Sequence, residues 1–214
     1  MRCFTRTLIF IYGVMAGTAG LYSYLRVARI LPPRVAMAAT SAPVVEPVLP
    51  IPRITDNDFH QLLLRELSMP IARATPESLE DTFTRPRPGR KTHEAIDIPA
   101  PRGTPIHALG DGVIEKLSAS PRGGITIYQF DTEGLYCYSY AHLDRYANRL
   151  REGVRVKHGD VIGYVGTTGD APADGPHLHL AIMRLRDSRH YWEGAPVNPY
   201  PLLVAIGTAV EGAN

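Results

Sequence analysis

Two histidines stand two residues apart in the segment DGPHLHLAIM (residues 174–183), which is apolar after its opening glycine and proline. In a β-strand, residues i and i+2 point to the same face, with Cα atoms roughly 6–7 Å apart. His177 and His179 therefore share one face, while Leu178 and Leu180 point to the opposite one. The pair is either structural or part of a chemical site, and the rest of the chain decides between these interpretations.

Three more side chains could act together with this pair. KTHEAID holds His93 and Asp97, four residues apart, and YSYAHLD holds His142 at the end of an aromatic-rich segment. Imidazole nitrogens and carboxylate oxygens are donors that zinc takes, and three protein ligands with an open fourth position are typical of catalytic zinc. The residue types therefore indicate metal-assisted chemistry.

The spacing of His93 and Asp97 restricts the backbone between them. In a straight strand they would lie about 13 Å apart, which is too far to share one metal ion. A helix is disfavoured because Pro99 follows directly. We therefore predict a turn at Glu94–Ala95 that brings His93 back over a strand beginning near Ile96.

The composition indicates how these side chains are positioned. The chain has 214 residues, of which 44% are hydrophobic and 21% charged, as in a globular protein. Glycine and proline number 19 each, which is typical of short strands and turns rather than of helices. We predict a mainly β fold with five or six strands, in the segments TPIHALGDGVIEKL, GGITIYQF, LYCYSYAHL, DVIGYVG and HLHLAIM.

The N-terminal part has a different composition. Residues 7–25 carry no charge, and as a helix they would measure about 28 Å, close to the thickness of a bilayer core. We interpret them as a transmembrane anchor, with a cleaved export signal as the alternative. The predicted organisation is a membrane segment at 1–30, a proline-rich linker at 31–53, a short helical segment at 54–82 and a β domain with the candidate site at 83–205.

Charge and cysteine content exclude further classes of function. The net charge is +2, but residues 1–30 hold four arginines and no acidic residue, so that the remainder carries −2. No basic stripe remains that would indicate binding to nucleic acid. Cys3 and Cys137 lie on opposite sides of the predicted membrane segment, so we expect no disulfide between them and a buried, unreactive Cys137.

The chain resembles the LytM/lysostaphin-type (β-lytic) zinc metallopeptidases, which cut peptide bonds in bacterial peptidoglycan. The resemblance lies in RKTHEAIDIPAPRGTPIHALGDGVI, YAHLDRY, VKHGDVIGYVGTTG and GPHLHLAI, in that order, and covers about residues 83–201. It implies an antiparallel β-sheet with a groove that receives an extended peptide. It also implies a zinc-dependent endopeptidase that hydrolyses peptide cross-links or stem peptides of peptidoglycan.

The resemblance further implies a role for each candidate residue. His93, Asp97 and His179 would bind zinc, and His142 and His177 would be the catalytic histidines. Spacing alone leaves open which histidine of the HxH pair binds the metal, since both imidazoles could ligate one ion. One catalytic histidine would accept the proton of water and the other would stabilise the oxyanion, in an order that the sequence does not assign.

Two positions depart from the usual pattern of the family. Ala95 replaces a glycine, so the predicted turn lacks a residue that readily takes positive φ. Ala181 replaces an acidic residue that could orient a ligating imidazole. Some relatives act only as activators of other wall hydrolases, which is the alternative function for this chain. A lipoyl- or biotinyl-type carrier, indicated by GDGVI and VKHGDVIG, would leave the candidate ligands without a role.

The expected location and partners follow from these features. We expect a single-pass protein of the cytoplasmic membrane whose peptidase domain faces the periplasm or cell wall, or a secreted protein if the N-terminal segment is cleaved. The expected partners are a peptidoglycan peptide, a zinc ion and the membrane.

Overall fold

The structure is a computed structural model that describes residues 56–87, 92–186, 190 and 194–211. The predicted membrane segment, the proline-rich linker and Cys3 lie outside these residues. Within the described part of the chain, no helix is long and apolar enough to cross a membrane.

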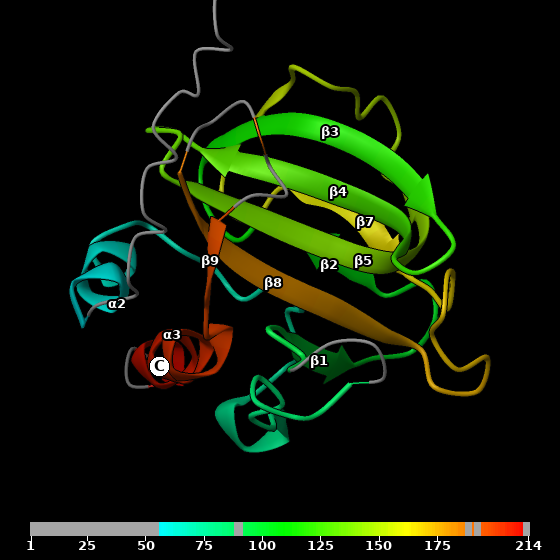
Figure 1. Cartoon of the computed structure of the whole chain (residues 1–214), viewed down its shortest axis with the longest axis horizontal. Coiled ribbons are helices and arrows are strands. Elements are labelled where there is room, and N and C mark those ends of the chain that lie inside the picture. The colour runs from blue at the N-terminus through cyan, green and yellow to red at the C-terminus, as the bar shows by residue number, and fades with distance from the viewer. Residues whose placement is uncertain (1–55, 88–91, 187–189, 191–193, 212–214) are drawn as a thin grey trace, which may run out of the picture. The chain divides into compact units, whose positions relative to one another are not determined.

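The described residues form two α-helices, one 3-10 turn and nine strands (Figure 1). The helical elements are α2 (Asp56–Leu63), η1 (Pro76–Ser78) and α3 (Pro199–Glu211). The strands are β1 (Ile96–Pro99), β2 (Pro105–His107), β3 (Gly112–Ser120), β4 (Gly124–Asp131), β5 (Tyr136–Tyr146), β6 (Arg155–Val156), β7 (Val161–Val165), β8 (His177–Leu185) and β9 (Gly194–Val197). The prediction of a mainly β fold is confirmed, although the described residues contain nine strands where five or six were predicted.

All nine strands belong to one antiparallel sheet. The main order is β1-β8-β5-β4-β3-β6, while β7 pairs with β2 and β5, and β9 pairs with β8. In Figure 1 the long strands β3, β4, β5 and β8 form a curved surface, and β1 lies beside β8. Helix α3 contacts β8, η1 and α2, so the helices lie at one side of the sheet.

The two faces of the sheet carry different side chains because strand residues alternate in direction. One face packs against the core, where the following side chains are at most 1% exposed: Ile96 and Ile98 of β1, Tyr136, Tyr138 and Tyr140 of β5, and Leu178, Leu180 and Ile182 of β8. The alternate residues include Asp97, His177 and His179. The same alternation that buries the apolar side chains therefore brings the candidate ligands to one face.

Two ion pairs connect the segment before β1 to the sheet. Arg184 Nη1 lies 3.0 Å from Asp58 Oδ1, and Arg65 Nη2 lies 2.8 Å from Asp131 Oδ2. Cys137, in the middle of the sheet, is fully buried, and this burial raises the pKa of its thiol well above the ordinary value. A protonated, inaccessible thiol agrees with the expectation of an unreactive cysteine.

Candidate active site

Strand register brings the first two candidate ligands together. Asp97 of β1 is paired directly with His179 of β8, and Ala141 of β5 lies on the other side of His179. Residues paired across strands point to the same face. As a result His179 Nδ1 lies 2.9 Å from Asp97 Oδ1.

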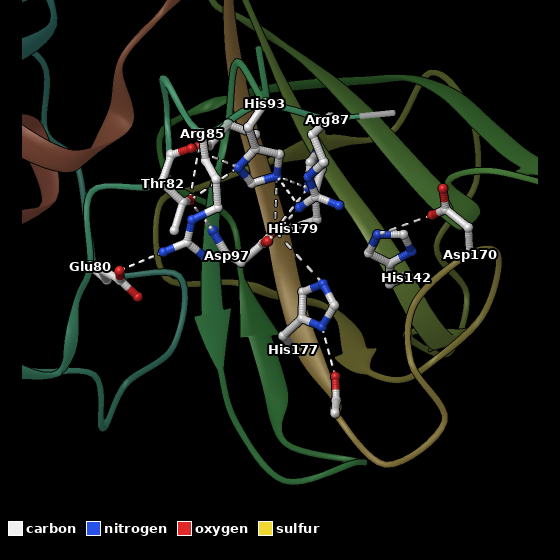
Figure 2. A network of polar contacts seen from close by, with 12 residues as sticks. Glu80, Thr82, Arg85, Arg87, His93, Asp97, His142, Asp170, His177 and His179 are labelled. Carbon is white, nitrogen blue, oxygen red and sulfur yellow. Dashed lines mark hydrogen bonds and ion pairs between the residues drawn. The ribbon is translucent and has the colours of Figure 1, made fainter. Parts of the chain in front are cut away.

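A turn brings His93 to the same point. Its Nε2 lies 3.2 Å from Asp97 Oδ1 and 3.0 Å from His179 Nδ1 (Figure 2). Glu94 takes φ 59°, and β1 begins at Ile96, which confirms the predicted turn. Because Glu94 takes the positive φ and Ala95 does not, the glycine that the family usually has at Ala95 is not required here.

Thr82 orients His93. His93 Nδ1 lies 3.1 Å from both the carbonyl oxygen and Oγ1 of Thr82, and this hydroxyl also accepts the backbone N–H of Asp97 at 3.2 Å. A carbonyl oxygen can only accept, so Nδ1 carries the proton and the Nε2 lone pair faces the other two candidate ligands. Sequence reasoning missed this buried threonine because no motif marks it.

A β-bulge brings His142 to the groove. Between two register pairs of β4 and β5, the two residues Ala141 and His142 oppose the single residue Thr126. His142 takes φ 61°, so its side chain faces the same groove as that of Ala141. Bulges next to active sites commonly redirect a side chain in this way. His142 lies within β5 rather than at the strand end predicted from the sequence.

His142 and His177 are each held by a backbone carbonyl. His142 Nδ1 donates to Thr168 O at 2.9 Å, and His177 Nδ1 donates to Gly175 O at 2.7 Å. The two ring centroids are 5.0 Å apart. In both rings the Nε2 lone pair is therefore left for other partners, and His177 Nε2 lies 3.7 Å from Asp97 Oδ1.

The protonation states follow from burial and from neighbouring charges. Burial lowers the pKa of His142, and the imidazoles of His179 and His177 lower it further, against the hydrogen bond to Thr168. Burial also lowers the pKa of His179. Burial alone would raise the pKa of Asp97, but hydrogen bonds and charge from His179 and His93 hold it well below its ordinary value. Neutral imidazoles and an ionised carboxylate are the forms that bind a metal.

Three of the five candidate residues line a groove of about 810 Å³. His93, His142 and His179 lie along it, and Tyr128 and Met183 contribute part of its apolar wall. Of the tyrosines in the strands, those at positions 136, 138 and 140 are fully buried in the core. A smaller cavity, about 230 Å³, is lined by residues between 65 and 138 and includes none of the five candidate residues.

The candidate ligands fit one metal ion. Within the described residues, one group of three His, Cys, Asp or Glu side chains could hold a metal, and it consists of His93, Asp97 and His179. Tetrahedral zinc with bonds near 2.1 Å places neighbouring ligand atoms about 3.4 Å apart. The separations of 2.9–3.2 Å between Nε2, Oδ1 and Nδ1 are close to this value.

Comparison with known proteins shows to which family the chain is similar. The sequence profile of peptidase family M23 matches residues 91–199. The chain is 44% identical over 93 residues to the peptidoglycan DD-endopeptidase ShyC of Vibrio cholerae, covering 44% of this chain and 20% of that protein. It is 34% identical over 149 residues to an L-Ala–D-Glu endopeptidase of Bacillus subtilis, covering 66% of this chain and 44% of that protein.

A solved structure shows the same fold. A protein from Ruminococcus gnavus, described as a glycyl-glycine endopeptidase of LytM type, superposes with a TM-score of 0.53 at 34% identity, covering 62% of this chain and 55% of that one. This chain thus spans less than half the length of the two curated relatives. The family profile nevertheless matches more than half of the chain, and the matched residues include all five candidate residues. The chain therefore belongs to peptidase family M23.

Proposed function

We propose that this protein is a zinc-dependent endopeptidase that hydrolyses peptide bonds of bacterial peptidoglycan. The observation that supports this most is the convergence of His93, Asp97 and His179 beside a groove that also contains His142. One curated relative is named a peptidoglycan DD-endopeptidase and another an L-Ala–D-Glu endopeptidase, and these names support the substrate class.

Each candidate ligand has a defined atom for the metal. His93 would bind zinc through Nε2, His179 through Nδ1 and Asp97 through its carboxylate. Bound zinc supplies Lewis-acid polarisation of a carbonyl group and activation of water. Because His179 Nδ1 lies 2.9 Å from Asp97 Oδ1, ligation through Nδ1 would require His179 to carry its proton on Nε2. The affinity would depend on pH, because protonated imidazoles cannot bind the metal.

His142 is the general base in this proposal. Its Nδ1 is held by Thr168, so its Nε2 lone pair is available, and its lowered pKa keeps it unprotonated at neutral pH. It accepts the proton of the attacking water and returns it to the leaving amine nitrogen. His177, whose ring centroid lies 5.0 Å from that of His142, would hydrogen-bond the substrate oxygen when its Nε2 carries a proton.

The direct test is digestion of purified peptidoglycan by the full-length chain, with a chelator, without it, and with zinc added back after chelation. We expect fragments with a newly freed amine and carboxylate, identified by mass spectrometry, which disappear on chelation and return with zinc. Absence of fragments at every zinc concentration, together with stimulation of a second wall hydrolase, would favour the activator alternative.

The proposed location is outside the cytoplasmic membrane. The support for it is the uncharged segment 7–25, the proline-rich segment 31–53 after it, and a substrate that lies in the cell wall.

A further inference from the structure

Arg87 contacts two of the three candidate metal ligands. Its Nη2 donates to Asp97 Oδ2 at 2.6 Å and lies 2.6 Å from His93 Nε2. Figure 2 shows the guanidinium group directed at these side chains from the segment that precedes His93. Arg87 also lines the groove, and its side chain is 36% exposed.

These contacts and a metal ion exclude each other. His93 Nδ1 donates its proton to Thr82, so Nε2 has one lone pair, which serves either the guanidinium or a metal. The guanidinium stays charged and can only donate, so it cannot itself become a ligand beside a divalent cation. A metal bound to His93 and Asp97 therefore requires that Arg87 leaves both atoms.

Charge explains why the guanidinium lies there. Asp97 is a partly buried carboxylate, and Arg87 is the cation that forms a charge-assisted hydrogen bond with it. The segment that carries Arg87 is held near this point, because Phe83 O accepts the backbone N–H of Glu94 at 2.9 Å. Arg87 thus neutralises the same negative charge that a metal would neutralise.

We propose that Arg87 is a built-in competitor of the metal, and that zinc binding displaces its guanidinium from His93 and Asp97. The inference rests on the metal site of the proposed function. Its consequence is that Arg87 sets the free zinc concentration at which the domain loads, and that loading moves a cationic side chain away from the ligands.

The test is the zinc affinity of full-length Arg87→Gln, measured in competition with a chromophoric chelator at fixed pH and ionic strength. Glutamine keeps most of the side-chain size but not the charge. We expect zinc to bind about tenfold more tightly, which corresponds to about 1.4 kcal/mol. We also expect a lower unfolding midpoint for the variant in excess chelator, because Asp97 has then lost its cation.

Two further variants make the measurement specific. Arg85→Gln is the matched control, since Arg85 lies in the same segment but its guanidinium pairs with Glu80. It should leave the zinc affinity unchanged. Arg87→Lys keeps the charge and should stay within about threefold of the unchanged protein, as expected if charge dominates the competition.

Zinc affinity also provides the result that would contradict the inference. If Arg87→Gln binds zinc with unchanged or weaker affinity while Arg85→Gln behaves as expected, Arg87 does not compete with the metal and the inference is wrong. This measurement needs no substrate, so it is independent of whether the protein cleaves peptidoglycan.

Discussion

At the scale of single residues, three histidines of the site are oriented in the same way. His93, His142 and His177 each place Nδ1 beside a backbone carbonyl oxygen, which leaves the Nε2 lone pair toward the ligands or the groove. The spacing of the histidines and the family resemblance led to the prediction that these three belong to the site. The sequence did not predict their tautomers, because the carbonyl groups belong to segments that the fold brings together.

The lowered pKa of His142 predicts the acid side of the pH profile. A general base works only when unprotonated, and burial favours the neutral imidazole, so the acid limb should lie below the ordinary histidine value of about 6.5. A nearby metal ion would lower this pKa further. The measurement is kcat/KM against pH with free zinc held constant by a buffer. An acid limb above pH 7 would contradict the assignment of His142 as the base.

At the scale of elements, the site depends on one turn and one bulge. The turn at Glu94–Ala95 could be predicted because neither a straight strand nor a helix lets His93 and Asp97 share an ion. The bulge at His142 could not, since the alternation of side chains in that segment gives no sign of an extra residue. Arg87 was missed for a similar reason, because the segment before His93 has no periodic pattern.

The bulge is supported by the loop that contains Gly169. This glycine has φ 79°, and a Cβ atom there would lie 2.3 Å from the carbonyl oxygen of Arg122. Gly169→Ala should therefore displace the neighbouring Thr168, whose carbonyl holds His142, and lower both kcat and the free energy of unfolding. The overpacking should cost about 1–3 kcal/mol beyond the backbone strain.

Gly159→Ala is the matched control for this loop. Gly159 has a similar φ of 83°, but a Cβ atom there would meet nothing within 4 Å. We expect the strain alone, about 1–2 kcal/mol in chemical denaturation, with kcat unchanged. Equal effects of the two substitutions on kcat would mean that the contact between the loop of Gly169 and residues 122–124 does not position His142.

At the scale of the whole molecule, the segment before β1 and the sheet share one core. Leu62, Ile71 and Leu79 belong to the same buried apolar cluster as Ile96 and Leu180. The sequence predicted a short helix in this segment, but not that its side chains complete the core. Such long-range packing has no signature in local spacing.

Substitution of Leu62 tests this shared core. Leu62 is fully buried, so Leu62→Ala should lower the free energy of unfolding by about 2–5 kcal/mol. Leu64 is 81% exposed, and Leu64→Ala should change it by less than about 0.5 kcal/mol. Urea denaturation of the metal-loaded proteins measures both values. Similar values for the two variants would show that the segment does not stabilise the sheet.

The proposed location is tested by a reporter enzyme, active only after export, fused behind Asn214. We expect activity from the fusion and none when residues 7–25 are deleted, because this segment is the proposed export signal and anchor. Activity of a cytoplasm-specific reporter at the same position would contradict the proposal.

The division of the site into ligands and catalytic histidines is tested most directly by comparing bound zinc in Asp97→Ala and His142→Ala, with peptidoglycan cleavage measured on the same samples. His158→Ala, at an exposed histidine that pairs with Asp111, is the control. We predict that Asp97→Ala loses most of its zinc, whereas His142→Ala keeps one zinc per chain and loses activity by about a hundredfold or more. Loss of zinc from His142→Ala as complete as that from Asp97→Ala would contradict the account.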